Sequence, residues 1–114
     1  MARRDADMKA AMLSIEEMVE RIVKRFHPHK IILFGSHARG SATPDSDVDL
    51  LIVMPVVGSK RRQATQIDAA LSDRWLPVDL IVVTPEEFAA YKNVVGHILY
   101  PAVREGKVLY EHAA

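Results

Sequence analysis

Two aspartates, Asp47 and Asp49, lie one residue apart near the middle of the chain. They stand at the start of an apolar run, and side chains alternate along a strand, so both carboxylates should point to the same face of a sheet. Without a cation, two charges this close would raise the pKa of one carboxyl group through repulsion. The pair therefore predicts a site for Mg²⁺, which prefers oxygen ligands.

A third aspartate, Asp79, lies inside the apolar segment 78–83. An unpaired charge buried in such a strand would be costly, so we expect this residue to be buried and to bind something. If its strand lies beside the one that carries Asp49, the acids can hold two metal ions, and Asp79 can accept a proton from an attacking hydroxyl. A structural carboxylate paired with Arg74 or Lys30 is the alternative interpretation.

Gly35 and Ser36 follow an apolar run at 30–34 and open a segment rich in Gly, Ser, Pro and Asp. Glycine allows close approach of the backbone to a ligand, and Ser36 offers a hydroxyl and an amide at the start of an expected short helix. These groups suit a phosphate. The sequence thus predicts a phosphate site that faces the metal site.

The first half of the chain predicts the elements that carry these residues. Apolar residues spaced by three and four from Met8 onward predict a helix of about five turns that ends before Pro28. The apolar runs 30–34 and 48–54 predict two buried strands. The segment 59–75 has helical spacing, with Trp75 expected in the core rather than as a stacking platform.

The second half predicts another strand and further helices. The run 77–83 is a strand candidate, and Thr84-Pro85-Glu86-Glu87 has the residues of a helix capping box. A helical pattern continues through 94–103, and Gly106 is the expected C-cap before a final edge strand. Together these patterns predict an α/β fold with three to four strands and about four helices.

Length and charge narrow the classes of function. The 114 residues suit one compact domain. Fifteen Lys and Arg residues balance fifteen Asp and Glu residues, so there is no overall positive field for extended nucleic acid. Cysteine is absent, which excludes disulfides and thiolate catalysis. With no apolar stretch of bilayer length and no secretory signal pattern, we expect a cytoplasmic protein.

Gly35-Ser36, ten intervening residues and Asp47-Val48-Asp49 resemble the signature of the DNA polymerase β-like nucleotidyltransferases. The longer string GSHARGSATPDSDVDLLI is similar to that of the minimal nucleotidyltransferases. The resemblance covers a motif core of roughly 31–84 within a single domain, 1–114. It implies a small mixed β-sheet with flanking helices, Mg²⁺ as the metal and ATP as the nucleotide donor.

The resemblance also implies roles for particular residues. Asp47, Asp49 and Asp79 match the three acids that bind metal and act in catalysis. Gly35 and Ser36 match the pair that binds the triphosphate.

Two further residues lie next to this pair. Arg39 fits a common extension of the motif and would bind phosphate, or it would tie the loop to Asp45. His37 departs from the family pattern, where Arg is frequent, and could contact phosphate, contact a partner or lie in solvent.

The acceptor is inferred from what the sequence lacks. Polymerases and small-molecule transferases usually have extra domains that hold the acceptor, so we expect a partner protein here. The chain resembles the antitoxin of toxin–antitoxin pairs in which a minimal nucleotidyltransferase adenylylates a tyrosine of a HEPN-family ribonuclease. Transfer to a small molecule, as in aminoglycoside nucleotidyltransferases, and a non-catalytic antitoxin that acts by binding alone are the alternatives.

Overall fold

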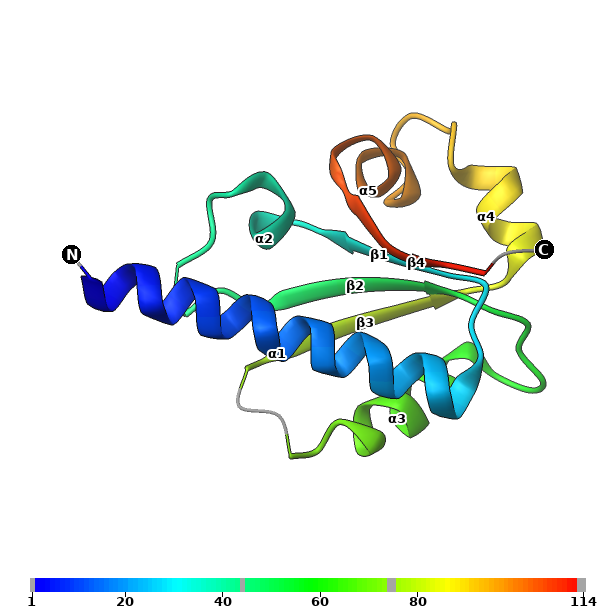
Figure 1. Ribbon diagram of the computed structural model, residues 1–114. Coiled ribbons are helices and arrows are strands. Elements are labelled where there is room, and N and C mark those ends of the chain that lie inside the picture. Colours follow the sequence, from blue (N-terminus) through cyan, green and yellow to red (C-terminus); the bar gives the residue numbers. More distant parts are fainter. Residues whose placement is uncertain (1, 44, 74–75, 113–114) are drawn as a thin grey trace.

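The structure is a computed structural model that describes residues 2–43, 45–73 and 76–112, with side chains described from residue 14 onward. In these ranges the backbone forms five helices and four strands (Figure 1). In chain order they are α1 (Ala2–Phe26), β1 (Lys30–Phe34), α2 (Ser36–Arg39), β2 (Val48–Val53), α3 (Lys60–Ala70), β3 (Val78–Val83), α4 (Pro85–Tyr91), α5 (Leu99–Glu105) and β4 (Lys107–Glu111).

The four strands form one mixed sheet in the order β3-β2-β1-β4. Strand β1 is antiparallel to both β2 and β4, whereas β2 and β3 are parallel and are connected through α3. The mixed sheet and the α/β class confirm the prediction from sequence. The final strand was also expected, and it lies at the edge beside β1.

Helices cover both faces of the sheet (Figure 1). Helices α1 and α3 pack on one face, and α4 and α5 pack on the other. Alternate residues of β2 enter different cores: Leu50 and Ile52 pack under α1 and α3, and Leu51 and Val53 pack with Leu99 of α5. Because β2 is buried on both faces after Asp49, its sequence from Leu50 to Val53 is a continuous apolar run and not an alternating one.

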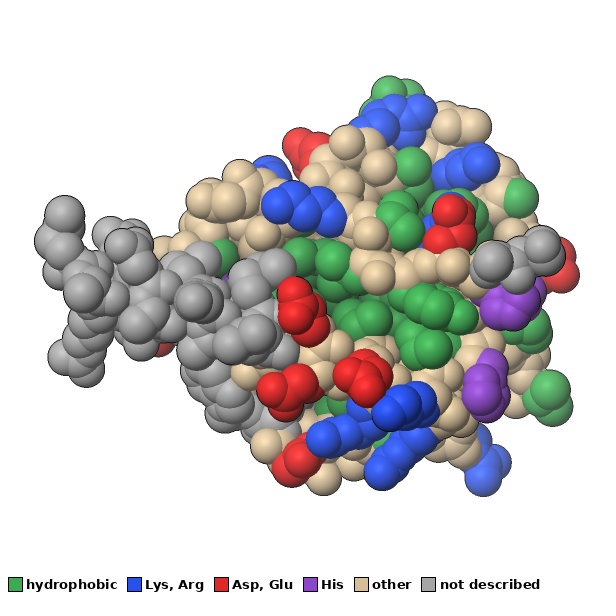
Figure 2. Space-filling view, in the orientation of Figure 1, with side chains coloured by type: hydrophobic (Ala, Val, Ile, Leu, Met, Phe, Trp, Pro, Cys, Tyr) green, Lys and Arg blue, Asp and Glu red, His purple; other side chains and the backbone are tan. Residues whose placement is uncertain are grey.

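Helix α1 begins at Ala2, earlier than the Met8 expected from its apolar spacing, and ends at Phe26. His27 has a left-handed backbone with φ 50, and the following Pro28 prevents continuation of the helix, as predicted. Figure 2 shows charged side chains on the outer face of this helix, beside a band of hydrophobic side chains. That band belongs to a groove between α1 and β4, with a volume of about 520 Å³.

Helix α3 ends at Ala70, which is earlier than predicted, and Trp75 lies outside the described residues. Its expected core residues Ile67 and Leu71 are buried. No helix among the described residues has the length and apolar character needed to cross a membrane.

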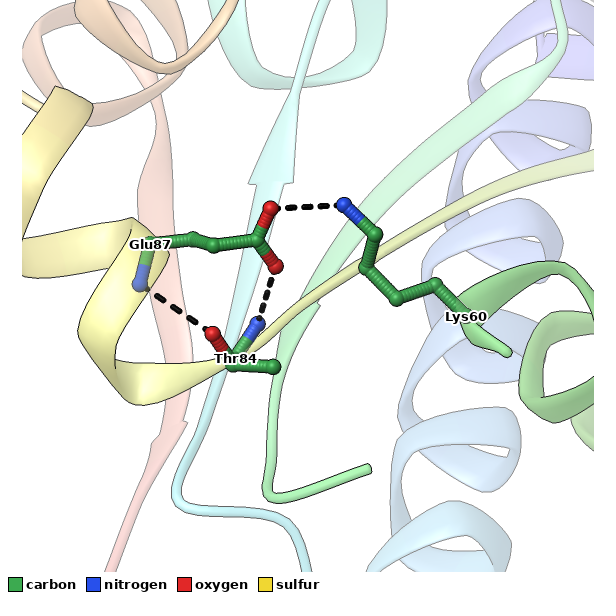
Figure 3. Close-up of polar contacts among 3 residues, drawn as sticks. All are labelled: Lys60, Thr84 and Glu87. Atoms are coloured by element: carbon green, nitrogen blue, oxygen red, sulfur yellow. Dashed lines mark hydrogen bonds and ion pairs between the residues drawn. The ribbon is translucent and has the colours of Figure 1, made fainter. Parts of the chain in front are cut away.

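The capping box at the start of α4 is present as predicted (Figure 3). The Glu87 amide donates to the Thr84 hydroxyl at 3.1 Å, and the Thr84 amide donates to the Glu87 carboxylate at 3.1 Å. The second carboxylate oxygen of Glu87 accepts from Lys60 Nζ at 2.6 Å. This contact connects the first turn of α3 to the first turn of α4, at the end of the sheet where β2 and β3 finish.

The helix predicted over 94–103 is wrong in its first half. Gly96 has φ 95, a conformation that interrupts a helix, and α5 begins only at Leu99. Val95 is 78% exposed, so the apolar spacing that suggested a buried helix face belongs to a surface turn.

Gly106 is the C-cap of α5, as predicted, but it has an extended backbone with φ −79. A side chain there would place Cβ 2.1 Å from the Ala102 carbonyl oxygen and 2.6 Å from Ile32 Cγ2. The glycine is therefore required by close packing of α5 against β1, and not by a left-handed turn.

The capping box gives a stability prediction. Thr84→Ala removes the acceptor for the Glu87 amide and should lower the free energy of unfolding by about 1 kcal/mol. Ser72→Ala removes an exposed hydroxyl and should change it by less than about 0.5 kcal/mol. Denaturant unfolding of both variants checks this, and equal losses would contradict a specific role for the cap.

Candidate active site

The sheet brings the predicted acids together. In the parallel pair of β2 and β3, Asp49 is the register partner of Asp79. Neighbouring strands lie about 4.8 Å apart, and paired residues direct their side chains to the same face. Asp47 precedes β2 by one residue. The assumed adjacency of the two strands is therefore correct.

The three carboxylates differ in exposure. Asp49 is half-buried, whereas Asp47 and Asp79 are exposed. The expectation that Asp79 is buried was wrong, because β3 is an edge strand and Asp79 lies near its open beginning. Lys30, one suggested partner of Asp79, instead pairs with Glu111 at 2.8 Å, and Arg74 lies outside the described residues.

Burial and repulsion act together on Asp49. Its pKa is raised above the usual value, first by partial burial and then by the charges of Asp79 and Asp47. The positive charges of His37 and Arg39 act in the opposite direction and are weaker. This arrangement disfavours a charged Asp49 unless a cation is added, as the spacing of the aspartates predicted.

Gly35 makes room for the Asp49 carboxylate. It has φ 73, and a Cβ placed on it would lie 2.2 Å from Asp49 Oδ2. Its neighbour Phe34 is the register partner of Asp49 in the antiparallel pair of β1 and β2. The expected phosphate-binding glycine is therefore also the residue against which the half-buried acid rests, a role that the sequence motif did not indicate.

Helix α2 begins directly after this glycine. The amides of Ala38 and Arg39 donate to the Gly35 carbonyl at 3.1 Å, and the Ser41 amide donates to the Ser36 carbonyl at 3.0 Å. Ser36 is half-buried, with its amide in the first turn, where no acceptor exists within the helix. The first turn of α2 therefore follows the Gly35–Asp49 contact without interruption.

His37 was expected at a phosphate, at a partner or in solvent, but it is buried, with 7% exposure. Its Nε2 lies 3.2 Å from the Ser46 carbonyl oxygen, a distance at which the nitrogen donates when it carries the proton. The contact connects α2 to the residue immediately before Asp47. We therefore assign His37 a positioning role, which a single sequence could not reveal because the contact depends on the path of the loop.

Arg39 is exposed at the end of α2. Within the described part of the chain it forms no ion pair with Asp45, so the structural alternative for Arg39 is not realised. The positive charge of Arg39 favours the ionised form of Asp49. The exposed Arg39 guanidinium can also bind an anionic ligand of the same site.

The donor set fits Mg²⁺ in its chemistry. The described residues contain no group of three His, Cys, Asp or Glu side chains arranged as a ready-made metal site. Magnesium is usually held by one or two carboxylates together with phosphate oxygens of a substrate, and not by a complete protein cage. Asp49, with its raised pKa and neighbouring acids, has the character of such a partial site.

Comparison with known proteins decides the family. Residues 15–102 match the nucleotidyltransferase domain family. The chain belongs to this family. The match confirms the resemblance drawn from the glycine–serine and aspartate motifs, and it identifies the chain as a nucleotidyltransferase.

A curated relative and two solved structures are similar to this nucleotidyltransferase. Protein adenylyltransferase MntA of Thermococcus cleftensis is 31% identical over 98 residues, which cover 79% of this chain and 98% of the relative. A Sulfolobus solfataricus protein assigned as a nucleotidyltransferase has a TM-score of 0.66 and 19% identity, with 94% of this chain and 86% of that chain covered. A toxin–antitoxin structure with AMP-PNP has a TM-score of 0.54 and 22% identity, with 85% and 73% covered.

A pair of glycine variants tests the contact between Gly35 and Asp49. Gly35→Ala and Gly40→Ala both introduce a side chain at positive φ, 73 and 76. Gly40 is left-handed helical, with ψ 15, and its substitution should cost about 1–2 kcal/mol of stability. Gly35 has ψ −154, a conformation that is nearly restricted to glycine, and its substitution should cost up to about 3 kcal/mol. Only Gly35→Ala displaces a carboxylate, because nothing lies within 4 Å of a Cβ at Gly40. We expect about 10²-fold slower nucleotidyl transfer for Gly35→Ala alone. Pyrophosphate release and thermal unfolding measure the two effects, and equal rates in both variants would contradict the role of the contact.

The raised pKa of Asp49 gives a pH-dependent prediction. The folded state binds a proton at Asp49 more tightly than the unfolded state, so this group lowers stability as pH rises through its folded pKa. In EDTA at pH 7, Asp49→Asn should therefore melt at a higher temperature than the unaltered protein, and the difference should vanish in acid. The exposed Asp45→Asn variant is the control and should show no such gain.

Magnesium should counteract the destabilising effect of the Asp49 carboxylate. Added Mg²⁺ is expected to raise the melting temperature of the unaltered protein more than that of Asp49→Asn, because the ion neutralises the repelling carboxylates. A lower melting temperature for Asp49→Asn in EDTA would show that the carboxylate is not under repulsion.

Proposed function

We propose that this nucleotidyltransferase moves AMP from ATP to a tyrosine hydroxyl of a partner HEPN-family ribonuclease toxin in the cytoplasm, with Mg²⁺ as cofactor. The observation that carries the proposal is the register pairing of Asp49 with Asp79, directly beside the turn at Gly35. The acids on adjacent strands are suited to hold metal ions and to accept a proton from an attacking hydroxyl. The serine-containing turn beside them is suited to bind a triphosphate.

In the proposed reaction the acceptor oxygen attacks the α-phosphorus of ATP. A bond forms between that oxygen and phosphorus, the bond from phosphorus to the bridging oxygen breaks, and pyrophosphate leaves. Asp79 takes the proton of the hydroxyl, a role supported by its exposure at the edge of the sheet. Its closeness to Asp49 keeps this base next to the reacting phosphate.

Other residues hold the donor. Asp47 and Asp49 would bind two Mg²⁺ ions together with Asp79, and bound Mg²⁺ would supply charge neutralisation at the phosphates. Ser36 and the backbone from Gly35 would orient the β- and γ-phosphates, with the exposed Arg39 adding positive charge. His37 would keep the segment that carries Asp47 in place through the Ser46 carbonyl.

The choice of acceptor rests on the comparisons. A relative similar over nearly its whole length is a protein adenylyltransferase, which supports a protein side chain as acceptor. A structural neighbour is part of a toxin–antitoxin complex with an ATP analogue, which supports a toxin as partner and ATP as donor.

Intact-mass spectrometry of a co-expressed HEPN partner, incubated with ATP and Mg²⁺, tests the proposal. The unaltered enzyme should add one or more AMP masses to the partner, and the Asp47→Ala, Asp49→Ala double variant should add none. The exposed Asp45→Ala variant, changed in the same loop, should retain transfer. A stable complex without any change in mass would instead indicate inhibition by binding alone.

A further inference from the structure

Strand β3 pairs with β2 along one edge, and no other strand of the described residues pairs with its second edge. The Pro77 carbonyl accepts from the Val48 amide at 2.8 Å, and the Val83 carbonyl accepts from the Met54 amide at 3.0 Å. Backbone groups alternate in direction along a strand. The N–H and C=O groups of residues 79 and 81 therefore also face β2, and those of residues 78, 80 and 82 face outward. The backbone groups of Val78 and Leu80 therefore point away from the sheet.

This outer edge is open where the catalytic site lies. Val78 and Leu80 are partly exposed and Asp79 is exposed, whereas the strand becomes buried at its end, with Val82 and Val83 each 6% exposed. In the described part of the chain, no backbone hydrogen bond outside the sheet ladder involves Val78 or Leu80. The unpaired stretch thus coincides with Asp79.

The two sheet edges differ in their protection. Strand β4, at the opposite edge, has an irregular register against β1 and carries charged residues at both ends, Lys107 and Glu111. Bulges and terminal charges are common protections against strand addition. The sequence VDLIVV of β3 has no proline, glycine or lysine, and its single charge is the Asp79 carboxylate. The edge of β3 is therefore the better template for another strand.

A groove of about 270 Å³ runs beside this edge. Helix α3 contributes one side through Arg61, Ala64 and Thr65, among others, and the strand contributes Val78, Asp79 and Leu80. Val78 and Leu80 direct their side chains to this groove, whereas the Asp79 side chain alternates to the opposite face of the sheet, where Asp49 and Ile81 lie. The groove therefore follows the strand on the face opposite to the proposed catalytic base, and it has mixed polar and apolar sides.

We propose that the acceptor binds as an extended peptide segment that adds to the outer edge of β3 as a fifth strand. This inference rests on the proposed function for the nature of the acceptor, a hydroxyl-bearing side chain of a protein. A residue opposite Asp79 on an added strand would have its Cβ about 5 Å from that of Asp79, on the same face of the sheet. The added backbone would therefore deliver a hydroxyl to the base and to the phosphate beside Asp49.

Main-chain pairing makes recognition tolerant of sequence around the acceptor. Hydrogen bonds from the segment to Val78 and Leu80 supply affinity, and the groove along α3 selects side chains. To bind in this way, the segment must be extended and must place its hydroxyl opposite Asp79. A flexible tail or loop of the partner is therefore the class of substrate that fits.

The test uses a nine-residue peptide of alternating Thr and Lys with a central Tyr, together with two versions N-methylated at alternate positions. With Mg²⁺ and AMP-PNP, the unmethylated peptide should slow hydrogen exchange of the Val78 and Leu80 amides, followed by NMR. One methylated peptide should fail, because its methyl groups face β3, and the other should bind. The one that fails reports whether the segment runs parallel or antiparallel to β3.

AMP transfer to the tyrosine of the same peptides, measured with ATP by mass spectrometry, separates this inference from the proposed function. Amide protection with one-sided sensitivity to methylation supports strand addition, and an absence of transfer would then count only against the proposed function. Equal transfer to both methylated peptides without protection would overturn strand addition and leave the proposed function standing. The absence of both amide protection and AMP transfer at millimolar peptide would also overturn strand addition.

A protein variant gives an independent measurement. Leu80→Pro removes an outward N–H, a change that edge strands tolerate, and should weaken peptide binding at least about tenfold. Circular dichroism and thermal unfolding establish whether the variant is folded. If it is not folded, the experiment with the methylated peptides decides whether the segment adds to β3. Amide protection that grows with protein concentration in the absence of peptide would show pairing between copies and would overturn the inference.

Discussion

The fit of the Asp49 carboxylate against Gly35 is the constraint on which the site depends. The carboxylate occupies the space that a side chain at Gly35 would fill, and it lies half-buried between two further acids. Burial and like charge both oppose its ionisation, so the free protein holds an acid in an unfavourable state. The surrounding core, with β2 buried on both faces, supplies the stability that keeps it there.

The grouping of the site residues could be predicted from sequence, but their exposure could not. Apolar runs placed Asp49 and Asp79 in two separate strands, and the assumption that these strands are neighbours was correct. The exposure of Asp79 depends on strand order, since the same sequence at the centre of a sheet would be buried. The burial of His37 depends on a loop contact with Ser46, for which no local pattern exists.

The fold was predictable where local chemistry determines it. The capping box at Thr84 and the helix stop at Pro28 involve neighbouring residues only, and both were found as expected. The segment 94–98 was mispredicted because exposed valines imitate a helix face. The glycine at position 96, which has φ 95 in the structure, was a local signal against a helix. Gly106 was correctly predicted as the C-cap of α5, but not because of a left-handed turn. A side chain there would collide with β1, which is distant in sequence.

The parallel connection of β2 to β3 through α3 has a consequence for the timing of folding. The two paired acids lie on either side of this crossover, so closing a long loop must precede their meeting. Parallel strand pairings of this kind form late in folding, because the chain loses loop-closure entropy before the contacts between the strands can stabilise it. A chain still being synthesised therefore carries no assembled pair of acids until β3 has emerged and docked, and competence for chemistry arises together with the finished sheet.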